Sequence, residues 1–146
     1  MTNKQSQFII QYNYEKPTNY TDERIEGLYS SERVNKNCGD VIEVFVDIEN
    51  GTIKRIHFTG NGCVLSIAST SIMIDIMTGC KKSDAIKKNS EFITFIDEGR
   101  DLNNLEIIDS RDITALNSIK KFSARISCIK LGWAAVGDVL RDHMLA

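Results

Sequence analysis

The sequence predicts an α+β fold in which helices cover one face of a small antiparallel β-sheet. Two segments rich in β-branched residues flank Asn50-Gly51, a pattern typical of a β-hairpin with a type I′ turn. Two later segments repeat apolar residues every three or four positions, which indicates helices packed on a core. The 146 residues have the length of one domain, so we expect residues 1–146 to fold as a single unit.

The charge balance and the short apolar segments exclude two classes of protein. The chain carries 18 Lys and Arg against 20 Asp and Glu, without the basic excess of nucleic-acid-binding domains, and we expect no nucleic acid partner. Its apolar runs are too short for a signal peptide or for the ~20 residues of a membrane span, and we expect no membrane contact. Four dispersed cysteines do not make a disulfide scaffold, so we expect a cytoplasmic protein with reduced thiols.

The N-terminal quarter of the chain gives few structural signals. Residues 1–36 are polar and irregular, and their best helical stretch is 21–30, which Thr21 can cap. The two strands of the hairpin are expected at residues 41–48 and 52–59. An earlier short strand should pair with this hairpin, and the sequence does not say where it lies.

A long helix is expected directly after the hairpin. Gly60 and Gly62 interrupt the second strand, and residues 63–77 follow with a core-facing apolar stripe. Gly79 is expected to end this helix, because glycine readily adopts the left-handed conformation that terminates helices. The stripe consists of Leu65, Ala68, Ile72 and Ile76.

The rest of the chain is expected to be helical. Residues 80–121 are predicted to form short helices at 84–88 and 111–116, with a loop at 101–104. Residues 123–145 are predicted to form a final amphipathic helix, because their apolar residues alternate at spacings of three and four.

Three cysteines lie at breaks between the expected elements. Cys38 precedes the hairpin, Cys63 begins the long helix, and Cys128 lies early in the last helix. Zinc takes four ligands in a tetrahedron, and these thiolates together with Asp40 supply such a set. Gly39 allows Cys38 and Asp40 to turn toward one ion. Spacing alone favours ordinary buried cysteines instead, because the sequence has no Cys-x-x-Cys pair.

Three motifs together change this interpretation. They are Asn-Cys-Gly-Asp at 37–40, Gly-Asn-Gly-Cys-Val-Leu-Ser-Ile-Ala-Ser-Thr-Ser at 60–71, and Lys-Phe-Ser-Ala-Arg-Ile-Ser-Cys-Ile-Lys-Leu-Gly-Trp at 121–133. In order and in detail they resemble the U-type iron–sulfur scaffold family, the SufU/IscU/NifU N-terminal fold. The resemblance covers a core at residues 37–139, and residues 1–36 match poorly. It implies the IscU/SufU-like fold and a metal site at Cys38, Asp40, Cys63 and Cys128.

Within this family the sequence is most similar to the zinc-dependent SufU branch. The IscU branch carries a histidine immediately before the last cysteine, where this chain has Ser127, and its stretch between the second and third cysteines is shorter. Arg125 and Trp133 also match the SufU pattern, whereas Ser123 stands where that branch usually has proline. The resemblance implies a zinc-containing acceptor of persulfide sulfur from a SufS-type cysteine desulfurase, acting with downstream proteins of iron–sulfur cluster assembly.

Two residues are expected to carry the sulfur chemistry. Cys38 is the predicted sulfur acceptor, because a glycine-flanked turn lets it leave the metal, and Cys128 is the second choice. Arg125 lies one helical turn before Cys128, where its charge would stabilise a thiolate or persulfide. Such a protein is a sulfurtransferase-like acceptor, and whether it is an enzyme in its own right stays open.

Two other hypotheses remain from the sequence. The same thiolates suit a [2Fe–2S] cluster, so the protein could instead be a scaffold that assembles the cluster itself. A cysteine hydrolase would need a histidine beside a thiol, and neither of the two histidines, His57 and His143, is next to a motif cysteine in sequence. Cys80 matches none of the ligand positions and is expected to be a bystander thiol.

Overall fold

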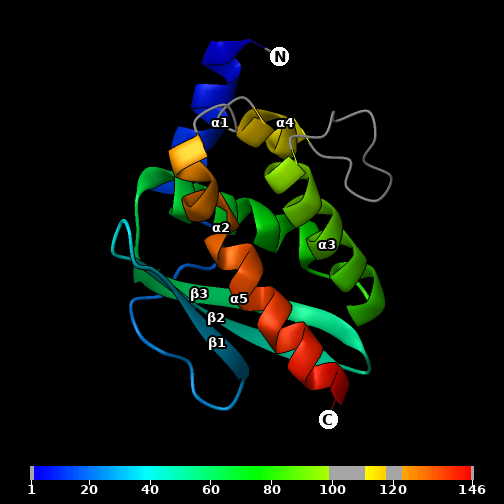
Figure 1. Ribbon diagram of the computed structural model, residues 1–146. Helices are drawn as coiled ribbons and strands as arrows, with labels where there is room; N and C mark the ends of the chain where they lie inside the picture. The colour runs from blue at the N-terminus through cyan, green and yellow to red at the C-terminus, as the bar shows by residue number, and fades with distance from the viewer. Residues whose placement is uncertain (1, 99–110, 118–122, 146) are drawn as a thin grey trace.

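The computed structural model describes residues 2–98, 111–117 and 123–145. Three antiparallel strands form one sheet in the order β1-β2-β3, and helices cover one of its faces (Figure 1), which confirms the predicted fold class. The strands are β1 (Tyr29–Asn35), β2 (Asp40–Glu49) and β3 (Thr52–Asn61). The helices are α1 (Asn3–Glu15), α2 (Val64–Met77), α3 (Lys82–Glu98), α4 (Arg111–Asn117), the 3-10 helix η2 (Ser123–Arg125) and α5 (Ile126–Leu145).

The β2–β3 hairpin forms where the sequence predicts it. Asn50 and Gly51 have φ angles of 54° and 76°, as a type I′ turn requires. Alternate residues of both strands are fully buried in the core beneath the helices: Ile42, Val44, Val46, Ile56 and Phe58. The strand that the sequence did not place is β1, which pairs with β2 from Tyr29 opposite Val46 to Asn35 opposite Asp40.

The predicted helix at 21–30 is wrong. Thr21 donates its backbone N–H to the carbonyl of Phe58 at 2.8 Å, so this part of the chain runs along β3. Thr21 Oγ1 accepts the N–H of Glu23 in a local turn instead of capping a helix. The segment then shields the second face of the sheet, where the Arg24 guanidinium lies 5.9 Å from the ring centroid of the buried Phe45.

Two helices differ from the sequence-based expectation. The sequence did not indicate α1, whose first turn is closed by reciprocal hydrogen bonds between Thr2 and Gln5. In place of a short helix at 84–88, α3 continues for 17 residues. Helix α4 confirms the helix expected at 111–116, and the loop expected at 101–104 lies outside the described residues.

Helices α2 and α5 cross in close contact. A Cβ atom at Gly132 of α5 would overlap Thr70 Oγ1 of α2 and would lie 2.9 Å from Thr70 Cβ. Beside this contact, Ser69 Oγ donates to the carbonyl of Ile129 at 2.7 Å and accepts the indole N–H of Trp133 at 3.0 Å. These side chains are buried, so the hydroxyls of Ser69 and Thr70 contribute to helix packing.

Trp133 is fixed from the side of α3 as well. Asn89 donates its side-chain amide to the Trp133 carbonyl at 2.7 Å, and Phe92 stacks on the indole with ring centroids 3.8 Å apart. The buried Asn89 therefore has a partner within a helix–helix contact, which offsets the cost of desolvating its amide. The position of α5 on the sheet is thus determined by contacts with both α2 and α3.

We predict that Gly132→Ala destabilises the protein by about 1–3 kcal/mol, because overlap with Thr70 outweighs the ~1 kcal/mol that alanine gains over glycine within a helix. Gly137→Ala in the same helix is the matched control, since its Cβ would meet Asn89 Oδ1 at 3.0 Å and the flexible Arg141 guanidinium at 3.2 Å. Chemical denaturation measures both. Adding Thr70→Ala should restore part of the loss, and wild-type stability of Gly132→Ala would contradict the close crossing.

Candidate metal centre

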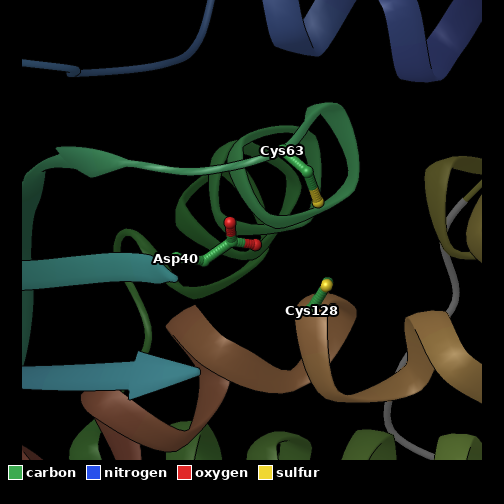
Figure 2. Close-up of side chains that lie close together, drawn as sticks. All are labelled: Asp40, Cys63 and Cys128. Carbon is green, nitrogen blue, oxygen red and sulfur yellow. The ribbon is translucent and has the colours of Figure 1, made fainter. Parts of the chain in front are cut away.

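Three potential metal ligands from distant parts of the sequence meet at one end of the sheet. Asp40 begins β2, Cys63 is the N-cap of α2, and Cys128 lies in the first turn of α5. Their ligand atoms all lie within 4.8 Å of one another. Figure 2 shows the two thiols and the carboxylate pointing toward a common centre. The close crossing of α2 and α5 therefore brings together residues that lie 65 positions apart.

Cys38 lies at the edge of this cluster. It occupies the turn between β1 and β2, it is exposed, and its Sγ is 3.6 Å from Cys128 Sγ. Gly39, with φ 74°, reverses the chain between Cys38 and Asp40, so that β2 begins two residues after Cys38. All four residues predicted as ligands thus lie in one region, three of them as a compact group and Cys38 on its solvent side.

The burial of these groups increases toward the centre. Cys38 is exposed, Cys63 is half-buried, and Cys128 is fully buried. Asp40 is only 5% exposed, and its Oδ2 is buried without a hydrogen-bond partner among the described residues. A buried carboxylate oxygen without a donor is costly, and a cation beside it removes that cost. The unpartnered oxygen is therefore the observation that fits a metal ion here.

The donor set and its spacing fit zinc. Thiolate and carboxylate are established zinc ligands, and sulfur atoms around a tetrahedral zinc lie about 3.8 Å apart. The distance of 3.6 Å between the sulfurs of Cys38 and Cys128 agrees with this spacing. Cys63 and Asp40 need only small side-chain adjustments from their present separations of up to 4.8 Å. Soft sulfur ligands also suit iron in iron–sulfur clusters, so the geometry alone does not select the metal.

The electrostatic environment keeps Cys128 protonated in the metal-free protein. Burial, followed by the hydrogen bond with Cys38 and the charge and hydrogen bond of Cys63, raises the pKa of the Cys128 thiol to about 12. A bound divalent cation reverses this preference, because it binds the thiolate and displaces the proton. Metal binding at this site is therefore expected to release a proton.

Two polar residues that the sequence analysis missed contact the cysteine sulfurs. Asn35 Nδ2 donates to Cys128 Sγ at 3.5 Å, and Ser66 Oγ lies 3.7 Å from Cys63 Sγ while donating to the Cys63 carbonyl at 3.1 Å. Both are buried. Ser66 follows Cys63 by three residues, a helix-start spacing that is visible in the sequence, whereas only the β1–β2 register reveals the position of Asn35.

The remaining residues considered from the sequence lie elsewhere or stay predictions. Arg125 ends η2 one turn before Cys128 and is exposed, and its role in stabilising sulfur is a prediction. Cys80 follows the far end of α2, about 20 Å from Cys63 along the helix, and contacts Lys88 Nζ at 3.3 Å. His143 lies 15 residues beyond Cys128 in α5, and His57 is on β3 opposite Phe45. Neither histidine is placed to serve a cysteine nucleophile.

Residues 5–129 match the family of NifU-like N-terminal domains. The chain belongs to this family. The match includes Cys38, Asp40, Cys63 and Cys128, and it confirms the resemblance that the three motifs indicated.

Named relatives come from both branches of the NifU-like family. The chain is 30% identical over 110 residues to the iron–sulfur cluster assembly scaffold protein IscU of Thermotoga maritima. The aligned region covers 73% of this chain and 72% of that protein. It is 32% identical over 102 residues to the zinc-dependent sulfurtransferase SufU of Bacillus subtilis, with coverages of 70% and 67%.

The fold is also found in solved structures. A crystal structure described as a proposed iron–sulfur cluster assembly scaffold for the SUF system, from Fervidobacterium islandicum, has a TM-score of 0.78 at 24% identity. The similarity covers 90% of this chain and 93% of that one. Within residues 2–98, 111–117 and 123–145, no helix combines the length and apolar character that crossing a bilayer requires.

We predict that Cys38 of the metal-free protein is alkylated at least about tenfold faster than Cys128 near pH 8, because exposure and thiolate content both control the rate. The pKa of Cys128 lies near 12. At pH values below this pKa, the thiolate fraction of Cys128 should therefore increase about tenfold when the pH is raised by one unit. Peptide mass spectrometry after timed iodoacetamide treatment measures each site. Equal rates at Cys38 and Cys128 would contradict the burial gradient.

Proposed function

We propose that the protein is a zinc-containing sulfur acceptor that takes persulfide sulfur from a SufS-type cysteine desulfurase and passes it toward iron–sulfur cluster assembly. The observation that carries the proposal is the arrangement of one exposed cysteine, Cys38, beside a buried group of two cysteines and a carboxylate. The buried group can retain a metal while the exposed thiol is engaged elsewhere. Such a division of roles suits a carrier.

Membership of the NifU-like family and the SufU relative support this proposal. The zinc-dependent sulfurtransferase of Bacillus subtilis is 32% identical to this chain over 102 residues, and Ser127 stands where the IscU branch has histidine. A zinc ion held by Cys38, Asp40, Cys63 and Cys128 would keep the thiolates deprotonated at neutral pH. We expect the protein to act in the cytoplasm with its desulfurase and with downstream assembly proteins.

The sulfur transfer itself is a thiol exchange. The thiolate of Cys38 attacks the terminal sulfur of a persulfide on the desulfurase and forms a new S–S bond. The S–S bond within the desulfurase persulfide breaks, and its cysteine leaves as a thiolate. The proton of the terminal sulfur stays with it, so Cys38 now carries the –S–SH group and no external oxidant is needed. Arg125, exposed one turn before Cys128, is proposed to stabilise the anionic sulfur during this exchange.

The second candidate function is assembly of a [2Fe–2S] cluster on the protein itself. Three thiols and one carboxylate in one region can serve as cluster ligands, and the Thermotoga maritima relative is named as a scaffold. Purification without oxygen separates the two functions. A colourless protein with one zinc per chain supports the acceptor, whereas a brown protein containing iron and sulfide supports the scaffold.

We predict that Cys63→Ser lowers zinc affinity more than about 100-fold, beyond the usual loss when an outer hydrogen-bond partner of a metal ligand is removed. Cys80→Ser is the matched control and should keep full affinity, because Cys80 lies at the opposite end of α2. Competition with a chromogenic chelator measures both variants. Loss of zinc in Cys80→Ser with retention in Cys63→Ser would overturn the ligand set.

We predict that Asp40→Cys tightens zinc binding and slows sulfur acceptance. A fourth thiolate closes the site as in structural zinc centres, whereas the harder carboxylate leaves Cys38 free to exchange. Zinc affinity and sulfide production with excess SufS-type desulfurase are measured on the same preparations. If the variant binds zinc more tightly and accepts sulfur at the parental rate, then ligand exchange does not limit transfer and the zinc has a structural role.

A further inference from the structure

Asn35 is the one residue whose hydrogen bonds reach both Cys38 and Cys128 in the described structure. It ends β1, three positions before Cys38, and is only 7% exposed. Its carbonyl accepts the backbone N–H groups of Cys38 at 3.3 Å and Gly39 at 2.8 Å. Its side chain donates from Nδ2 to Cys128 Sγ at 3.5 Å and to Ser127 Oγ at 3.1 Å. One asparagine thus joins the turn of Cys38 to the helix of Cys128.

The side-chain oxygen of Asn35 has a separate structural role. Asn35 Oδ1 accepts the backbone N–H of Asn37 at 3.2 Å, a contact within the turn. The amide nitrogen serves the sulfur site, and the amide oxygen serves the backbone. These two halves of one side chain can therefore be separated by a substitution that changes only the nitrogen.

Asn35 contacts the two cysteines through different groups. Asn35 donates an N–H directly to the sulfur of Cys128, whereas it contacts Cys38 only through the Cys38 backbone N–H, and the Cys38 thiol is exposed. A hydrogen bond to a thiolate reduces the electron density available for attack and restrains the sulfur in place. The sulfur of Cys38 has no such restraint from Asn35.

We propose that Asn35 is a positioning residue that makes Cys38, and not Cys128, the cysteine that receives sulfur. Asn35 keeps the Cys128 sulfur oriented toward the metal position and lowers its nucleophilicity, while the turn it closes presents Cys38 to solvent. This inference rests on the proposed sulfur-acceptor function and deepens it by naming what selects the acceptor. Ser127 Oγ accepts a hydrogen bond from the same amide nitrogen but does not contact the sulfur of Cys38 in the described structure.

Asn35→Asp provides the sharpest test. Aspartate has the same shape and keeps an oxygen for the Asn37 N–H, but it has no N–H to offer to Cys128. Asn13→Asp is the matched control, because Asn13 is equally buried and bonds to Ile9 and Ser71, away from the cysteines. Ser127→Ala removes the second acceptor and should leave the choice of cysteine unchanged. Asn35→Ser is measured beside Asn35→Asp, because it removes the amide N–H without adding a carboxylate charge next to Cys128.

The test uses glutathione persulfide as donor, so it does not depend on a desulfurase. Mass spectrometry locates the added sulfur in the zinc-loaded proteins. We expect wild type and Asn13→Asp to carry it on Cys38, and Asn35→Asp to raise the ratio of Cys128 to Cys38 persulfide about tenfold, the effect expected when a hydrogen bond to a charged group is lost. An unchanged ratio in Asn35→Asp and Asn35→Ser would overturn the inference.

A spectroscopic measurement supplies a readout that a purely structural role would not change. In cobalt-substituted protein, loss of the N–H donor should shift the sulfur-to-cobalt charge-transfer band to lower energy in both Asn35 variants, because the thiolate becomes a better electron donor. Asn13→Asp should leave the band in place. A wild type that takes no sulfur on any cysteine contradicts the proposed function. A wild type that takes sulfur on Cys38, with Asn35 variants that do the same and show an unshifted band, contradicts only the role of Asn35.

Discussion

Helices α2 and α5 touch at Gly132, where the missing side chain leaves room for Thr70. This contact determines how far apart the starts of the two helices lie, because Ser69 binds both the carbonyl of Ile129 and the indole of Trp133 within the same crossing. Cys63 and Cys128 stand at those two helix starts. Close packing in the protein interior permits little adjustment, so the separation of the two thiols follows from the helix crossing and not from any bond between the cysteines.

The second constraint is electrostatic. The cluster places Asp40, with a buried unpartnered oxygen, beside two thiols, one of which resists ionisation through burial. Negative groups brought together in an apolar setting repel one another, and a divalent cation converts that repulsion into attraction. The fold thus brings the candidate ligands together without a metal, and a bound metal would add stability because only the folded chain gathers these ligands. Exposure of Cys38 leaves one side of the site accessible to a partner.

Local sequence signals predicted the β2–β3 turn and α2, whereas α1 was missed although a local capping box closes its first turn. Asn50-Gly51 specifies its turn through backbone conformation alone, and the stripe of residues 63–77 is strong enough to identify α2. The helix expected at 21–30 was wrong because pairing of Thr21 with Phe58 is a long-range contact that overrides local propensity. Family motifs indicated the cysteines and Asp40, but the role of Asn35 depends on strand register and on a helix 93 positions away, and no pattern within the sequence records that contact.

The turn between β1 and β2 has a consequence for the order in which the site assembles. Asn35 and Asp40 pair directly across a four-residue connection, so Cys38 and Asp40 acquire their relative positions from a contact that closes a very short loop. Cys63 and Cys128 meet only after a loop of 65 residues closes, and long loops lose more entropy and close more slowly. We therefore expect the Cys38–Asp40 half of the candidate site to form in the β1–β2 hairpin before helix docking brings in Cys63 and Cys128. A nascent chain that has emerged only to the end of β2 already contains both residues of this half, Cys38 and Asp40.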